Sequence, residues 1–150
     1  MTAHEQQVRD FFARYEARFQ DAIGDNPQVD VDGVVGSFAD YFVESSPVGV
    51  QGGANDAQFR EAIPQGYAMY RQIGITSMKV GALEVVPVNE LHVMAKVHWV
   101  SDYRKQDGVT GSIAFDNVYF LTLASGEPEI FAYVTPDEQA ALREHGLIPE

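Results

Sequence analysis

The chain has 150 residues, of which 45% are hydrophobic and 11% aromatic, and its formal net charge is −12. This length suits one domain over residues 1–150, and the apolar content is typical of a folded chain. The negative charge argues against nucleic acid and anionic membranes as partners, because phosphate-binding surfaces need clustered Lys and Arg. The absence of cysteine excludes disulfides, thiolate catalysis and Cys-ligated zinc. The polar N-terminus and the lack of a long apolar run lead us to expect a soluble, cytoplasmic protein.

The first twenty-odd residues predict an amphipathic helix, since apolar side chains recur there at three- and four-residue spacing. These side chains are Val8, Phe11, Phe12, Tyr15, Phe19, Ala22 and Ile23. The sequence "IGDNP" then supplies a glycine stop and a following proline. A second, short helix is expected within residues 29–38, although its two glycines weaken helix formation by about 1 kcal/mol each.

Residues 38–50 read "FADYFVESSPVGV", a strand-like run that turns polar at Ser45 and Ser46. If Ser46 points inward, it lines a cavity; if it points outward, this is an ordinary strand end. The following "VQGGAND" is predicted to be a loop, with a helix starting at Asn55 or Asp56. That helix covers residues 57–74 and should kink at Pro64.

From Ile75 onward the apolar period changes to two, which predicts strands over residues 75–88, 91–103, 109–123 and 129–135. Residues 135–146 are expected to form a C-terminal helix with Thr135 or Asp137 near its cap. Helices followed by a run of antiparallel strands predict an α+β fold, in which a curved antiparallel sheet wraps around three N-terminal helices. An enclosed space between sheet and helices is a natural result.

Three stretches carry a resemblance to a known family. They are "FFARYEARF" at 11–19, "SFADYFVESSPVG" at 37–49 and "AFDNVYFL" at 114–121. Nearly the whole chain resembles the nuclear transport factor 2-like superfamily, and its motifs are most similar to the ketosteroid isomerase and SnoaL-like polyketide cyclase branch. The resemblance implies a cone-shaped α+β barrel with a short C-terminal helix. It places the family's tyrosine at Tyr15 and its buried aspartic acid at Asp116.

The resemblance also implies a departure from isomerase chemistry. The isomerases carry an aspartate base directly before the matching proline, and here that position is Ser46. A serine hydroxyl cannot take a proton at neutral pH without a neighbouring base, so an authentic ketosteroid isomerase is not expected. Tyr15 and Asp116 could still act as hydrogen-bond donors, with Glu44 or a water as the substitute base. The alternatives are a core role for Tyr15, a salt-bridged or turn-facing Asp116 and a solvated Glu44.

The strand over residues 91–103 has two different faces. Trp99 alternates with Val93, Ala95 and Val97, and we expect it to be a cavity wall or plain core. The other face carries His92, Met94, Lys96, His98 and Val100. This half-polar face would be exposed in a monomer, and by resemblance it would pack against a second copy in a homodimer. His92 and His98 are about 20 Å apart along the strand, so we expect neither a metal nor another cofactor.

Two functions remain open on the sequence alone. One is an isomerase-, cyclase- or dehydratase-like enzyme acting on a hydrophobic small molecule, with Tyr15, Asp116 and Glu44 as its catalytic residues. The other is a non-catalytic ligand-binding or dimeric interaction domain. In both, the expected ligand-binding side chains are those of Ser46, Trp99, Phe42, Tyr67, Phe120 and Phe12.

Overall fold

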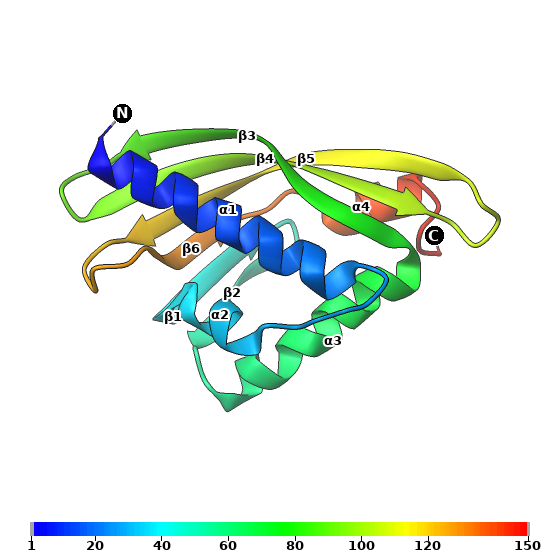
Figure 1. Cartoon of the computed structure of the whole chain (residues 1–150), viewed down its shortest axis with the longest axis horizontal. Coiled ribbons are helices and arrows are strands. Elements are labelled where there is room, and N and C mark those ends of the chain that lie inside the picture. The colour runs from blue at the N-terminus through cyan, green and yellow to red at the C-terminus, as the bar shows by residue number, and fades with distance from the viewer. Residues whose placement is uncertain (1, 150) are drawn as a thin grey trace.

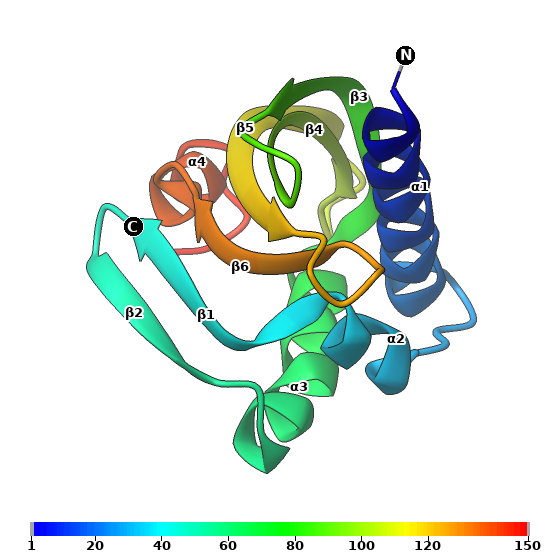
Figure 2. The ribbon, with the colours of Figure 1, turned by 90° about the vertical axis from the view of Figure 1, so that its left-hand side faces the viewer.

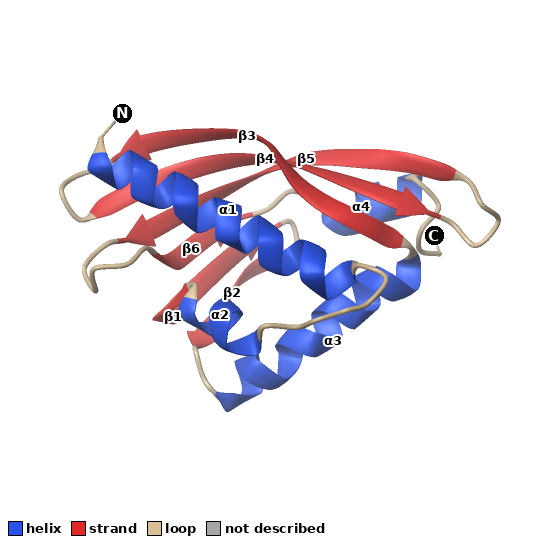
Figure 3. Cartoon of the chain, in the orientation of Figure 1, coloured by secondary structure: helices blue, strands red, loops and turns tan. Residues whose placement is uncertain are grey.

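The computed structural model describes residues 2–149, which form four helices and one six-stranded sheet. In chain order these are α1 (Ala3–Ile23), α2 (Val31–Gly36), β1 (Phe38–Ser46), β2 (Gly49–Ala54), α3 (Ala57–Ile73), β3 (Ile75–Pro87), β4 (His92–Arg104), β5 (Thr110–Thr122), β6 (Glu129–Val134) and α4 (Glu138–Glu144). Figure 1 shows α1 lying along the curved sheet, and Figure 3 shows the same arrangement by type of element. The predicted α+β class is confirmed.

The sheet has the strand order β2-β1-β6-β5-β4-β3. Its neighbours are antiparallel except for β1 and β6, which run parallel, so the prediction of a wholly antiparallel sheet was wrong for this pair. The parallel pair arises because the chain leaves β1 through β2 and α3, then meanders back from β3 to β6. Figure 2 shows the resulting curl, with α1 alongside β3.

Residues 50–54 were predicted to be a loop, but they belong to β2. Three of the six residues of β2 are glycine, so the strand has no alternation of apolar and polar side chains that could reveal it. Its partner β1 supplies the register, which pairs Glu44 with Gln51 and Ser46 with Gly49. The strand order places β2 at the edge of the sheet, and all of its residues are exposed.

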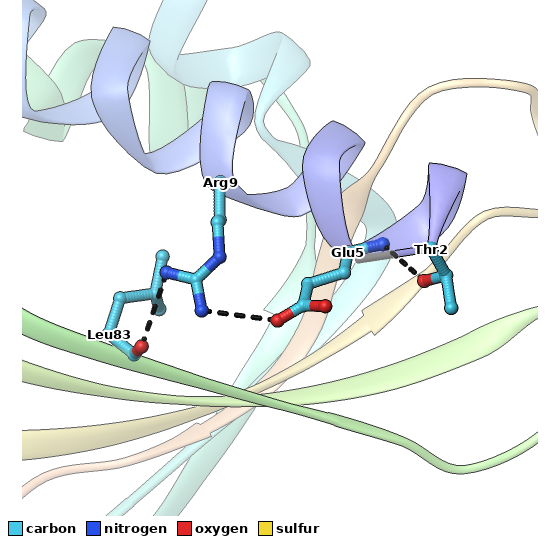
Figure 4. A network of polar contacts seen from close by, with 4 residues as sticks. All are labelled: Thr2, Glu5, Arg9 and Leu83. Atoms are coloured by element: carbon cyan, nitrogen blue, oxygen red, sulfur yellow. Dashed lines mark hydrogen bonds and ion pairs between the residues drawn. The ribbon is translucent and has the colours of Figure 1, made fainter.

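Helix α1 begins where its sequence provides a cap. The Thr2 side chain accepts a hydrogen bond from the Glu5 backbone N–H at 3.0 Å, which satisfies one of the free donors of the first turn. Figure 4 shows how the helix is then tied to the sheet: Arg9 pairs with Glu5 at 3.1 Å and donates to the carbonyl oxygen of Leu83 on β3 at 3.3 Å. The buried face of the helix packs into the core.

Helix α3 starts at Asp56, whose side chain accepts from the Phe59 backbone N–H at 3.1 Å. It continues through Pro64 to Ile73 without interruption. Gly74 ends it in the left-handed region with φ +100°, and a Cβ there would collide with the carbonyl oxygen of Arg104. This close approach fixes the position of α3 against the end of β4.

The inward side chains of β4 form the centre of the core. Positions 93, 95, 97, 99, 101 and 103 are all buried, while the alternate positions are more exposed. The face of Trp99 therefore points inward, toward the helices. Helix α4 covers part of this interior through Leu142, which is also buried. No helix within residues 2–149 combines the length and apolar character needed to cross a bilayer.

Candidate functional site

A cavity of about 340 Å³ lies between the concave face of the sheet and the helices. Its apolar wall includes Phe19, Phe38, Phe59, Ile63, Met78, Trp99 and Phe115. Its polar lining is unusual for so apolar a space and consists of Tyr15, Tyr67, Tyr70, Tyr119, Tyr133, Asn117, Glu44 and Glu138. These groups come from α1, α3, β1, β5, β6 and α4, so most of the chain contributes to one site.

Tyr119 is held by two side-chain hydrogen bonds, more than any other of these groups. Its hydroxyl oxygen accepts one hydrogen bond from Trp99 Nε1 at 3.0 Å and one from Asn117 Nδ2 at 3.1 Å. Two donors on the oxygen leave the hydroxyl hydrogen free to bond an acceptor in the cavity. Burial raises the pKa of Tyr119 to about 12, and the bonds from Asn117 and Trp99 act in the opposite direction. Tyr119 is therefore a neutral donor at neutral pH.

Tyr15 provides a second phenol. Its ring centroid lies 6.0 Å from that of Trp99 and 6.4 Å from that of Tyr119. Within residues 2–149 its hydroxyl has no hydrogen-bond partner, unlike the satisfied core tyrosine that was the alternative. Burial, reinforced by Tyr119, raises the pKa of Tyr15 well above its ordinary value, so this hydroxyl also stays neutral. Tyr15 and Tyr119 thus both lie near Trp99 in the cavity lining, as two phenols that can donate into the cavity.

Two carboxyl groups share the cavity, and a tyrosine holds each. Tyr133 donates to Glu44 Oε2 at 3.0 Å, and Tyr70 donates to Glu138 Oε1 at 2.5 Å. Burial raises the pKa of Glu138, the bond from Tyr70 opposes this shift, and the charge of Glu44 adds to it. Glu138 is thus a carboxyl group that holds its proton to higher pH than an exposed glutamate does.

Asp116 is not in the position that the resemblance implied. Its side chain is 45% exposed and bonds His98 Nδ1 at 2.7 Å, with Lys96 Nζ at 3.8 Å. In the antiparallel register Asp116 lies opposite His98, and opposite residues share a face of the sheet. The carboxylate therefore points to the outer face, and Asn117 takes the inward position. The expected pairing of Tyr15 with Asp116 in the cavity was wrong.

The other predicted ligand-binding residues divide into three groups. Trp99 and Tyr67 line the cavity, as does the predicted base Glu44. Phe120 has the parity of Asp116 and packs on the outer face against Phe131, with ring centroids 6.4 Å apart. The expectation that it lines the cavity was therefore also wrong.

Phe12, Phe42 and Ser46 lie behind or beside the cavity. Phe12 is buried in the core and its ring centroid is 5.0 Å from that of Tyr119. Phe42 packs behind the wall, 4.7 Å from Phe38 by ring centroids. Ser46 ends β1, and its hydroxyl accepts from the Val48 backbone N–H at 3.4 Å. The serine that replaces the isomerase base thus participates in the turn between β1 and β2.

Sequence reasoning did not identify Asn117, Tyr119, Tyr133 or Glu138 as site residues. A signal existed for Tyr119, because Ile113, Phe115 and Leu121 share its parity and form the more apolar face of β5. Glu138 had no such signal, since it lies in the first turn of α4 and looks like an ordinary helix-start residue. Within the described chain, no three His, Asp or Glu side chains gather as a metal ion would need.

Comparison with known proteins places this geometry in context. A family model described as "NTF2-like protein (DUF6841)" matches residues 4–138. The protein Aln2 from a Streptomyces species has a similar structure, with a TM-score of 0.67 at 17% identity, covering 96% of this chain and 97% of that one. No curated protein matches the sequence significantly.

Two further solved structures have related folds. An NTF2-like protein with a cystatin-like fold from Novosphingobium aromaticivorans has a TM-score of 0.65 at 14% identity, covering 97% of this chain and 89% of that one. A ketosteroid isomerase-like protein from Erwinia carotovora atroseptica has a TM-score of 0.54 at 14% identity, covering 88% of this chain and 91% of that one. At these identities the similarity shows the fold alone.

Proposed function

We propose that this chain, which belongs to the NTF2-like family (DUF6841), binds a mostly apolar small molecule with a carbonyl or phenol oxygen in its cavity. We further propose that the protein moves a proton on that molecule. The observation that carries this proposal is the Tyr119 hydroxyl, which accepts from Trp99 and Asn117 and shares an apolar cavity with two carboxyl groups. Donors and proton carriers in one mostly apolar cavity are the elements of general acid–base catalysis.

Tyr119 and Tyr15 bind the ligand oxygen. Both phenols are neutral at neutral pH, as an ordinary tyrosine is, and burial raises their pKa values further, so they donate hydrogen bonds and take up no proton. When a proton leaves the carbon beside a carbonyl group, negative charge develops on the oxygen. Two fixed donors aimed at that oxygen stabilise the charge more than they stabilise the neutral ketone. This pair replaces the Tyr15–Asp116 pair that the resemblance implied.

Glu44 is the proposed base and Glu138 the proposed acid. Glu44 lies two residues before Ser46 on β1, on the inward face of the strand, and Tyr133 holds its Oε2 atom. Glu138 keeps a proton more readily because burial raises its pKa. A base that removes a proton and an acid that delivers one suit an isomerisation, a cyclisation or a dehydration.

The proposal is tested by proton exchange on α-tetralone, a planar apolar ketone, in D₂O followed by NMR. We expect the protein to accelerate exchange beside the carbonyl group, and Tyr119→Phe to reduce this rate by about 10²–10³. Glu44→Gln should abolish the acceleration. Tyr41→Phe is the matched control, because Tyr41 is 75% exposed and lies outside the cavity.

A non-catalytic binding domain is the second candidate, favoured by the serine at the position of the isomerase base and by the outward Asp116. It predicts that α-tetralone binds with no accelerated exchange. A protein that neither binds the ketone nor exchanges its protons would contradict both candidates.

A further inference from the structure

A second chamber of about 380 Å³ adjoins the cavity and lies against α4. The two spaces share Tyr70, Met78, Phe115, Pro136 and Glu138 in their linings. The hydrogen bond between Tyr70 and Glu138 therefore stands at the boundary between them. A ligand in the first cavity has the second chamber directly beside it.

The wall of the second chamber contains one polar side chain that the protein leaves unsatisfied. Ser101 is 2% exposed, and its Oγ atom has no hydrogen-bond partner among the described residues. The other inward positions of β4 are Val93, Ala95, Val97, Trp99 and Tyr103. A buried hydroxyl without a partner costs about 1–3 kcal/mol. Alanine at this position would avoid that cost, and a polar group held in the chamber would remove the cost from serine.

The same chamber borders a free stretch of sheet edge. Strand β6 pairs with β5 only from Val118 to Thr122, so the preceding residues of β5 have no partner strand on that side. Ala114 and Asp116 from this stretch contribute to the chamber lining, and Ala141 and Leu142 of α4 lie against it. Ile75, Ile113 and Met78 supply apolar surface to the chamber, and Tyr70, Asp137 and Glu138 add polar groups to its lining.

We propose that this second chamber takes the hydrocarbon arm of the ligand and that Ser101 hydrogen-bonds a polar group at the end of that arm. The inference rests on the proposed function, since the head of the ligand is the carbonyl or phenol group held by Tyr15 and Tyr119. The ligand class is thus an elongated molecule with a flat, oxygen-bearing head and an apolar arm that ends in a hydroxyl or carbonyl group.

Three dimethylaminonaphthyl ketones test this, because their emission depends on the polarity around them. One carries an acetyl group, one a hexanoyl chain and one an ω-hydroxyhexanoyl chain. We expect both chain-bearing probes to bind more tightly than the acetyl probe. Ser101→Ala should weaken binding of the ω-hydroxy probe by about 2- to 13-fold, which is one hydrogen bond, and leave the other two unchanged.

A second pair of variants tests the space itself. Ala141→Leu fills part of the chamber and should weaken both chain-bearing probes at least about tenfold, while the acetyl probe still binds. Gln139→Leu is the matched control, because Gln139 lies on the exposed side of α4. If all three probes bind with equal affinity, and these variants leave the affinity of the chain-bearing probes unchanged, the second chamber is not a subsite and the proposed function stands. If no probe binds, both proposals fail.

Discussion

Trp99 is the only tryptophan of the chain, and it lies in the cavity wall with its indole N–H bonded to Tyr119. Its fluorescence therefore reports on the cavity alone. We expect α-tetralone to shift or quench this emission as it binds, because the ligand displaces solvent beside the indole. Titration with a fluorimeter measures the effect. Emission that stays constant while an independent method detects binding would place the ligand elsewhere.

Trp99→Phe tests how much the hydrogen bond to Tyr119 stabilises the fold. Phenylalanine keeps an aromatic ring in the wall but removes the N–H donor and leaves a gap. We expect a loss of about 1–3 kcal/mol in the free energy of unfolding. Urea denaturation followed by circular dichroism gives the value without relying on the missing fluorophore. An unchanged midpoint would show that the Tyr119 oxygen finds another donor at no cost.

Glu138 predicts a pH dependence of stability. Burial raises the pKa of Glu138 in the folded chain above 4.5, the ordinary value of a glutamate in an unfolded chain. Between these two pKa values the folded chain binds more protons than the unfolded chain, so stability falls as pH rises through that window. Below the window Glu138 contributes no such slope. Glu138→Gln should remove this contribution, seen as a flatter stability profile above pH 4.5, and an equal slope in both proteins would contradict it.

At the scale of elements, α3 offers a matched pair of glycines. Gly74 has φ +100°, and an added Cβ would collide with the Arg104 carbonyl oxygen, whereas a Cβ at Gly66 meets nothing within 4 Å. Gly66→Ala should stabilise the protein by about 0.5–1 kcal/mol, because alanine suits a helix interior better. Gly74→Ala should destabilise it by more than about 1 kcal/mol. Thermal or urea unfolding measures both, and equal effects would refute the role of Gly74.

The sequence was sufficient to predict most of the helices and strands, but not to predict which side chains line the cavity. The helix start at Asp56 and the inward face of Trp99 could be predicted because capping residues and apolar alternation are local signals. The orientation of β5 was missed because Asp116 was placed by resemblance, although the bulkier apolar side chains share the parity of Tyr119. Register decides such a case, since a shift by one residue turns every side chain to the other face.

Other features could not be predicted from local signals. The strand at 49–54 is too rich in glycine to show a period, and only its pairing with β1 defines it. Glu138 reaches the cavity through the path of the chain after β6, which brings it to Tyr70, a residue 68 positions earlier. Long-range contacts of this kind leave no trace in the neighbouring sequence.

At the scale of the whole molecule, the outer face of the sheet is the place where we propose a homodimer contact. Phe120 and Phe131 pack there, on the same face as the hydrogen-bonded side chains of His98 and Asp116. Phe120→Glu should raise the dimer dissociation constant at least about tenfold, because it brings a new negative charge into each copy of an already acidic protein. Sedimentation equilibrium measures this. Val109→Glu is the control, since Val109 is 50% exposed in the turn between β4 and β5; a wild-type monomer would contradict the proposal.

The parallel seam between β1 and β6 has a consequence for kinetics. It joins Glu44 to Tyr133 across 89 positions, so the cavity closes only after β3, β4 and β5 have brought β6 into place. Contacts between segments so distant form late, since the entropy of closing a long loop opposes them. A molecule that binds the closed cavity contacts groups that are still apart in the folding transition state. Occupancy should therefore lengthen the lifetime of the native protein and leave its refolding rate almost unchanged.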